Sequence, residues 1–479
     1  ELTAFTAEPE NLLALAGAGL IFTSGQLPLD PKTKAIPDDI KAQAAMALDN
    51  LRATMMWLGI VLHVAVIHLA GPSPLPWRDN QTTPTADLLM AFIHAFRMPV
   101  FFILAGFFVA LLIERRGARA MAHNRLRRLG LPFVVFWPPI FALCGALALA
   151  FLHRMARGTW GLDPALMQTA PSAPQGLSTM HLWFLWMLLW LSLGTALAHA
   201  GLARFAPDAA PWLGRWLAQL GRTPWGIALL TLPLAGIGML YPDGLLQPNG
   251  SFLPPWTEWV HNGLFFGFGL ALHGQRATLL AHCVRRWPWY AAAGLVLFFI
   301  TGALFGAQPR SASGLPPALR LGVALSYNAT SWCWSLALIG GFLVHVPRPS
   351  AWLSYLADSS YWVYLVHMPM TIGFGAVLFG LPWPAGVKML LNIAPFVGCW
   401  HENPLITQSM TQLTSQAVES QQNDAIGTVP DNADVAFEHE QPHLALSSLA
   451  LNQYLPFETE QVSLWHNDGQ THALHVDLK

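Results

Sequence analysis

Nine long apolar segments and a weaker tenth run through the middle of the chain, and they constrain its fold more than any other feature. They lie near residues 55–70, 88–113, 129–152, 181–199, 225–241, 259–273, 287–305, 321–346 and 352–379, and the weaker one is 385–397. A helix needs about 20 mostly apolar residues to cross a bilayer. Loops rich in proline and glycine separate the segments. The pattern predicts an all-α integral membrane bundle with about nine or ten transmembrane helices.

Composition agrees with a lipid environment. Only 11% of the 479 residues are charged, whereas soluble domains carry roughly a quarter. The net charge of -1 argues against nucleic acid as a partner. Four cysteines lie far apart with no CxxC spacing, so we interpret them as small hydrophobes and predict neither a disulfide framework nor a metal site.

Lysine and arginine in the loops predict the orientation. If the first helix starts in the cytoplasm, the inside loops carry 13 of these residues and the outside loops carry 5. An excess of positive charge marks the cytoplasmic side. We therefore expect a cytoplasmic N-terminus.

The segment NLRATMMWLGIVLHVAVIHLA, residues 50–70, contains the first candidate site. Arg52 and His63 are eleven residues apart, which puts them within about 20° of one helix face and roughly 16 Å apart along the axis. An ionisable side chain at membrane depth suggests function. The alternatives are a neutral histidine bonded to a neighbouring carbonyl and an arginine that only sets topology.

A second candidate site lies in residues 96–132. Arg97 interrupts an apolar helix, and six arginines crowd the predicted inside loop 114–128. Guanidinium groups bind phosphate bidentately, and Arg125 and Arg128 share a face if helical. They could hold the nucleotide of coenzyme A, with the pantetheine arm carrying a thioester towards His63. Topology and contact with lipid phosphate are the alternatives.

Several motifs in order resemble the acyltransferase-3 family over about residues 47–394. They are Arg52-x10-His63, FRMPVFFILAGFF, Arg125-x-x-Arg128 before Leu131-Pro132, HLWFLWMLLW and SYWVYLVHMP. Members of this family are multi-helix inner-membrane enzymes that O-acylate carbohydrates. LDNLRA with FRMPVFF is most similar to the branch that includes glucan biosynthesis protein C, which is linked to succinylation of periplasmic glucans.

This resemblance implies roles for individual residues. His63 would be the catalytic base or acyl acceptor, with Arg52 beside the donor. Arg125 and Arg128 would support donor binding or the active fold. From chemistry alone, a histidine suits general-base catalysis at neutral pH.

Four further residues are weaker candidates. Arg97 could contact the donor and stabilise the oxyanion, although topology or a lipid contact is the alternative. His181 and His367 are candidates for lining the site, with interfacial positions as the alternative. His94 lies four residues before the Met98–Pro99 kink, and it is a candidate for lining the site from the bundle interior.

The two ends differ from the bundle in composition. Residues 1–46 include AGLIFTSGQLPLDPKT, and residues 10–53 resemble the start of the RidA/YjgF family of imine deaminases. A complete domain of that family is more than twice as long, so we do not carry over its activity. Residues 399–479 form an acidic tail rich in Gln and Asn, with two predicted strands around Asn467-Asp468-Gly469. A metal site at the tail histidines is a weak alternative.

The sequence thus predicts three segments, 1–46, 47–398 and 399–479, and a multi-pass protein of the bacterial inner membrane. Its predicted function is O-acyl transfer from acyl-CoA, as co-substrate, to a glycan, with no bound cofactor. The alternatives are a transporter or flippase, an inactive composite of unrelated segments, and an imine deaminase.

Overall fold

The computed structural model describes residues 40–169, 176–307, 314–345, 351–398, 463–465 and 471–473. The chain divides into two units, Glu1–Phe396 and Val397–Lys479. The segment 1–39, and with it most of the RidA/YjgF resemblance, lies outside the described residues.

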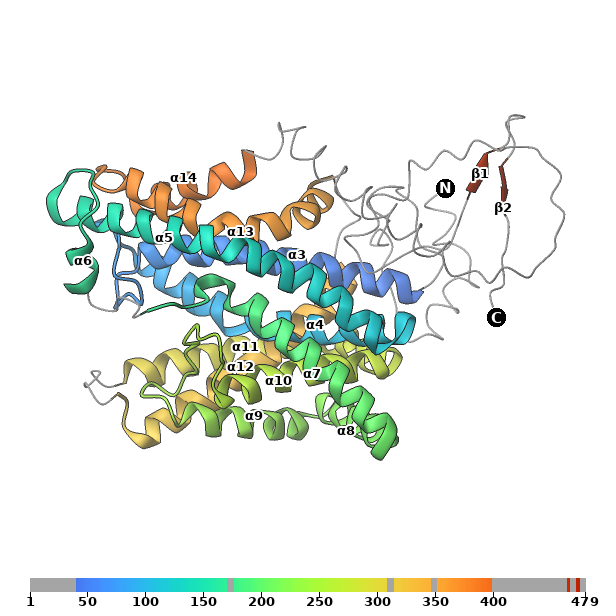
Figure 1. Cartoon of the computed structure of the whole chain (residues 1–479). Coiled ribbons are helices and arrows are strands. Elements are labelled where there is room, and N and C mark those ends of the chain that lie inside the picture. Colours follow the sequence, from blue (N-terminus) through green and yellow to red (C-terminus); the bar gives the residue numbers. More distant parts are fainter. Residues whose placement is uncertain are drawn as a thin grey trace, which may run out of the picture. The chain divides into compact units, whose positions relative to one another are not determined.

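The first unit is helical. Its long elements are α3 (Ile40–Ile67), α4 (Pro84–Arg125), α5 (Leu131–Arg157), α7 (Trp183–Phe205), α9 (Pro224–Gly238), α10 (Trp256–Gly274), α11 (Arg276–Gly306), α12 (Pro317–His345), α13 (Ala351–Leu378) and α14 (Ala385–Gly398). Shorter ones are η1 (Leu126–Gly130), α6 (Pro164–Thr169), η2 (Met180–Leu182) and α8 (Ala209–Gly221). The long helices run side by side (Figure 1). Each predicted apolar segment falls on one of them.

Four helical stretches among the described residues are long and apolar enough to cross a membrane. They are Asn50–Ile67, Pro84–Arg157, Met180–Phe205 and Arg276–Gly306. Shorter apolar helices occur at Pro224–Gly238, Val363–Leu378 and Ala385–Phe396. The predicted all-α membrane class is confirmed, and the count of nine or ten crossings stays a prediction.

Helix α4 is central, because it packs against α3, α7, α10 and α12. Its closest neighbour is α10: a Cβ at Gly106 would collide with the Phe266 carbonyl, and one at Gly269 would collide with the Ile103 carbonyl. Small residues allow two membrane helices to approach this closely. Two glycines, one on each helix, therefore fix how α4 meets α10.

Gly117 turns the chain at the end of the central helix. Its φ of 81° interrupts the helical path of α4, a conformation that glycine adopts without steric cost. The predicted inside loop 114–128 is thus wrong in detail, since helix continues on both sides of the turn. It passes through the π-helical segment η1 into α5. The Pro84–Arg157 stretch therefore contains two of the predicted apolar segments.

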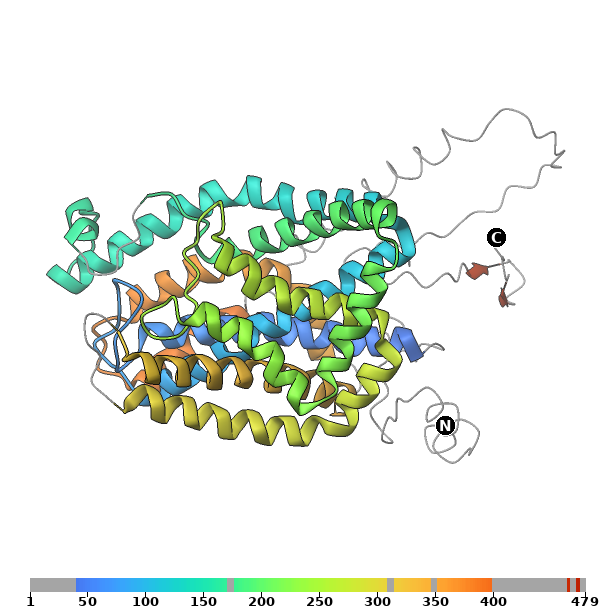
Figure 2. The same cartoon turned by 90° about the horizontal axis from the view of Figure 1, so that it is seen from below.

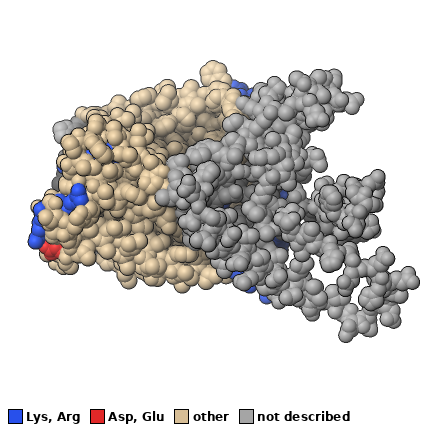
Figure 3. Space-filling model, turned by 90° about the horizontal axis from the view of Figure 1, so that it is seen from above, with Lys and Arg blue, Asp and Glu red and all other residues tan. Residues whose placement is uncertain are grey.

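Apolar side chains cover much of the outer surface. Val134 on α5, Trp225 on α9 and Phe299 on α11 are each more than half exposed. Helix α11, yellow in Figure 2, lies at the periphery, and few residues of its most apolar stretch are buried. The face in Figure 3 shows few charged residues among those described. Such a surface suits contact with lipid tails.

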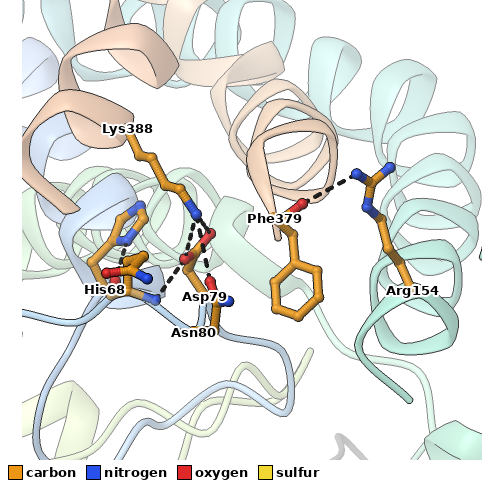
Figure 4. Close-up of polar contacts among 7 residues, drawn as sticks. His68, Asp79, Asn80, Arg154, Phe379 and Lys388 are labelled. Carbon is orange, nitrogen blue, oxygen red and sulfur yellow. Dashed lines mark hydrogen bonds and ion pairs between the residues drawn. The ribbon is translucent and has the colours of Figure 1, made fainter. Parts of the chain in front are cut away.

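An ion pair anchors α14 to the segment between α3 and α4. The Nζ atom of Lys388 donates to the two carboxylate oxygens of Asp79 at 2.8 and 3.0 Å (Figure 4). Both side chains are almost completely buried. The same segment is held by His68, whose Nδ1 donates to the Gln81 carbonyl at 2.9 Å. Residues far apart in sequence are thereby joined.

In the second unit, β1 (Ser463–Trp465) pairs antiparallel with β2 (Thr471–Ala473), with Leu464 opposite His472. These strands flank the predicted turn. The rest of the predicted tail, with its other histidines, lies outside the described residues.

Candidate functional site

Three histidines from three elements meet inside the bundle. His63 lies on α3, His181 on η2 and His367 on α13. The ring centroids of His63 and His367 are 5.0 Å apart, and those of His181 and His367 are also 5.0 Å apart. Sequence reasoning selected these residues separately, and the structure brings them into one group, which we call the histidine group.

Hydrogen bonds to carbonyl groups hold two members of the histidine group. His181 Nε2 lies 3.2 Å from the Leu365 carbonyl oxygen, and His367 Nδ1 lies 2.6 Å from the Tyr364 carbonyl oxygen. A carbonyl only accepts, so these nitrogens donate and the opposite nitrogens carry lone pairs. Tyr364 also donates its hydroxyl hydrogen to the His181 carbonyl at 2.8 Å. The pair therefore forms a fixed frame beside His63.

His63 is the most accessible member of the histidine group. His181 and His367 are 7% and 2% exposed, and His63 is half-buried. The contact with His367 places its ring towards the bundle interior. It is thus the imidazole best placed to exchange a proton with a bound molecule.

Arg97 extends from α4 to the turn of α3 that precedes His63. Its guanidinium lies against Gly59, where an added Cβ would be 2.9 Å from Nη2. Its charge is within electrostatic range of His63 and His367. Arg97 is 7% exposed, and it lies about 30 Å along α4 from the Gly117 turn. The structure therefore places Arg97 with the histidine group and apart from the other predicted donor-binding residues.

The arginine group comprises Arg52, Arg125 and Arg128. Arg125 is the last residue of α4 and Arg128 lies in η1, and both Arg52 and Arg128 are within electrostatic range of Arg125. Arg52 and Arg125 are half-buried, while Arg128 is exposed. Guanidinium groups gathered in this way can bind phosphate oxygens bidentately, and π-helical turns are frequent at functional sites. The arrangement suits a phosphate-bearing ligand.

Helix α3 connects the arginine group with the histidine group. Arg52 and His63 lie on this one continuous helix, roughly 16 Å apart along its axis. One group can bind an anion and the other can transfer a proton. The geometry thus suits a long molecule that is anionic at one end and reactive at the other.

Comparison with known proteins identifies the family. The family described as an acyltransferase domain matches residues 47–399, well over half of the chain. The chain belongs to this acyltransferase family. No solved structure matches it at a significant level.

Relatives of this acyltransferase occur in Salmonella. Proteins named glucans biosynthesis protein C from Salmonella agona and Salmonella paratyphi A are each 25% identical to it over 338 residues. The match covers 69% of this chain and 83% of each relative. These findings confirm the resemblance stated for residues 47–394. They give no support to the RidA/YjgF resemblance.

Sequence reasoning missed three features of this acyltransferase. Gly59 carries no chemistry, and its role follows only from the guanidinium lying against it. Tyr364 was visible within SYWVYLVHMP but was not singled out. A lysine within an apolar helix indicates a buried partner, so Lys388 could have been singled out, although nothing in the sequence identified Asp79 as that partner.

No group of three or more His, Cys, Asp or Glu side chains that could hold a metal ion occurs in the described part of the chain. Cys144, Cys283 and Cys333 are buried and free, and Cys399 lies outside the described residues.

Proposed function

We propose that this acyltransferase moves an acyl group, succinyl or acetyl, from acyl-CoA to a hydroxyl of a glycan. The observation that carries the proposal is the relation of two sites along α3. The arginine group lies at one end of this helix, and the half-buried His63 lies about three turns along it, against His367, which in turn contacts His181. The relatives named for glucan biosynthesis support a glycan acceptor.

The donor enters from the cytoplasmic side in this scheme. The excess of lysine and arginine in one set of loops supports a cytoplasmic position for Arg52, Arg125 and Arg128. Guanidinium groups recognise the phosphates of coenzyme A. The pantetheine arm then reaches along α3 and places the thioester carbonyl beside His63, within the bacterial inner membrane.

His63 acts as the general base. Its imidazole takes the proton of the acceptor hydroxyl while that oxygen attacks the thioester carbonyl carbon. The tetrahedral intermediate collapses as the C–S bond breaks, and the coenzyme A thiolate takes the proton from the imidazolium. Arg97 stabilises the oxyanion, because a preorganised cationic donor acts strongly in a water-poor site. In a variant of the scheme, the imidazole itself carries the acyl group between donor and acceptor.

Mass spectrometry of envelope glycans tests this proposal. Cells that produce the protein should show glycans heavier by the mass of an acyl group, and cells without it should not. His63→Ala should abolish this mass increase. His282→Ala should retain it, because His282 lies on α11 and is bonded to Tyr290. Equal glycan masses with and without the wild-type protein would contradict the proposal.

A further inference from the structure

Pro369 leaves one carbonyl group of α13 without its helical partner. In an α-helix the carbonyl of one residue accepts the N–H of the residue four positions later. Four positions after Leu365 stands Pro369, which has no N–H. The Leu365 carbonyl instead accepts from His181 Nε2 at 3.2 Å. The single N–H of a neutral His181 ring is therefore committed to Leu365, and Nδ1 of this ring can only accept.

His367 is held on the same helix so that its outer nitrogen is also an acceptor. Its Nδ1 donates to the Tyr364 carbonyl oxygen at 2.6 Å, which leaves a lone pair on Nε2. His367 is buried, and Nε2 has no hydrogen-bond donor among the described residues. A buried acceptor without a donor is costly. A donor that reaches His367 Nε2 would therefore be favoured.

The rings around His367 leave His63 as the source of that donor. Ring contacts join His367 to Tyr364, His181 and His63. The Tyr364 hydroxyl donates to the His181 carbonyl at 2.8 Å, and the His181 ring donates to Leu365. The centroids of the His63 and His367 rings are 5.0 Å apart. This separation accommodates an N–H···N bond of about 2.9 Å once the ring edges face each other.

Transfer of a proton to His63 would strengthen this contact. The charge of Arg97 on α4 is within electrostatic range of His63, as are His94 on the same helix and His181 on η2. A protonated His63 therefore adds a second positive charge near Arg97. A hydrogen bond from an ionised donor is about twice as strong as one between neutral groups. A neutral His367 that accepts the N–H of the imidazolium would offset the repulsion.

We propose that His367 is a positioning residue for acyl transfer. Its Nε2 accepts the N–H of His63 and directs the other nitrogen of His63 towards the acceptor hydroxyl. The same bond stabilises the imidazolium that forms when the hydroxyl proton arrives. That proton then leaves with the coenzyme A thiolate, so His367 neither gains nor loses a proton. The inference rests on the proposed function, which supplies the reaction.

Substitutions of His367 separate an acceptor role from a packing role. Glutamine can present an amide oxygen near the position of Nε2, whereas leucine has similar bulk and no acceptor. His367→Leu should lower kcat about 10- to 100-fold, as expected for loss of a hydrogen bond to a charged group. His367→Gln should recover most of this loss. KM for acyl-CoA should change little in both, because the bond strengthens only as charge develops.

Two more variants complete the kinetic test, which uses the full chain in lipid nanodiscs with thermal unfolding in the same lipid. His367→Asn keeps an amide that reaches only the position of Nδ1, so it should lose as much kcat as leucine and replaces that variant if leucine does not fold. His153→Leu is the matched control, because His153 Nδ1 also bonds a backbone carbonyl, that of Thr159 at 2.8 Å. It should keep the wild-type kcat.

Carbethoxylation by diethyl pyrocarbonate tests the contact without acyl-CoA or glycan. Positive charge develops on the imidazole as its nitrogen attacks the reagent, and peptide mass spectrometry measures the rate at His63. The rate should fall about tenfold in His367→Leu and His367→Asn through loss of the same hydrogen bond, and it should stay near the wild-type rate in His367→Gln. The rate at His153 in the same samples is the internal reference and should not change.

The inference and the proposed function fail in different ways. If the wild type transfers acyl groups but His367→Leu and His367→Asn keep the wild-type kcat, or if His367→Gln loses as much as they do, the inference is overturned and the proposed function stands. If the carbethoxylation rate at His63 follows the residue at position 367 as expected but the wild type transfers no acyl group, the contact stands and the proposed function fails.

Discussion

Replacement of Gly59 by alanine tests whether the position of Arg97 matters for transfer. The added Cβ would lie 2.9 Å from Arg97 Nη2, whereas ordinary contact begins at 3.4 Å. The guanidinium must therefore retreat by about 0.5 Å. It is the far end of a flexible side chain, so the fold should accommodate the change. Alanine in a helix interior is favoured over glycine by about 1 kcal/mol, so the unfolding temperature should hold or rise.

Activity should respond in the opposite direction. Loss of one oxyanion donor lowers kcat by about 10²- to 10³-fold, and a shift of half an ångström should weaken the contact without abolishing it. We expect kcat to fall about tenfold while KM for acyl-CoA changes little. The assay is steady-state transfer from acyl-CoA by protein in nanodiscs, combined with thermal unfolding in the same lipid.

Gly267→Ala on α10 is the matched control, because an added Cβ there meets nothing within 4 Å. It should keep the wild-type kcat. If Gly59→Ala also keeps the wild-type kcat, the assignment of Arg97 to the oxyanion is refuted.

Three further predictions concern the fold. Lys388→Met should lower the unfolding temperature, since removal of one partner of a buried ion pair costs about 3–5 kcal/mol, and adding Asp79→Leu should recover much of the loss in the same melting assay. Burial lowers the pKa of His68 below its ordinary value of 6.5. Below about pH 6.5 the unfolded chain therefore binds a proton that the folded chain does not, so the folded state should become less stable as the pH is lowered. His68→Gln should flatten this dependence of the unfolding temperature in melts between pH 7.5 and 5. Gly106→Ala should destabilise by about 1–3 kcal/mol through overpacking, whereas Gly263→Ala, whose nearest neighbour is a Leu191 side chain at 3.8 Å, should not; equal melting of the two would contradict the α4–α10 packing.

Hydrophobic patterning predicted the helices well, because lipid-facing and core-facing residues are both apolar. The segments 129–152 and 321–346 fall within α5 and α12 almost unchanged. The inside loop 114–128 was the main error in position. Its arginines suggested a solvated loop, yet arginine is a good helix former, and a single glycine with positive φ makes the turn.

Spacing on one helix predicted only part of the candidate site. Arg52 and His63 share α3, so their relation followed from the helical period. The meeting of His63 with His181 and His367 depends on packing among three elements, and one sequence does not encode that in a local pattern. Arg97 was placed with the donor-binding arginines, although the length of α4 separates it from Arg125 and directs it to Gly59. The number of helical residues between Arg97 and Arg125 would have predicted this separation, whereas the residue type alone did not.

The His94–Tyr327 contact and the buried ion pair show the same limit. His94 was a candidate from its position before Pro99, but its partner Tyr327 is 233 residues away in sequence. Lys388 and Asp79 are separated by 309 residues. Such pairs depend on tertiary contacts, which hydropathy and periodicity do not report.

The most direct test of the central claim is the transfer rate of purified His63→Gln in nanodiscs with radiolabelled acyl-CoA and a neutral glucan acceptor. Glutamine keeps a polar side chain of similar size but cannot take a proton at neutral pH. If His63 is the base that activates the acceptor hydroxyl, the rate should fall by at least 10²-fold while acyl-CoA binding is retained. A rate close to that of the wild type, in a variant that melts like the wild type, would contradict the claim.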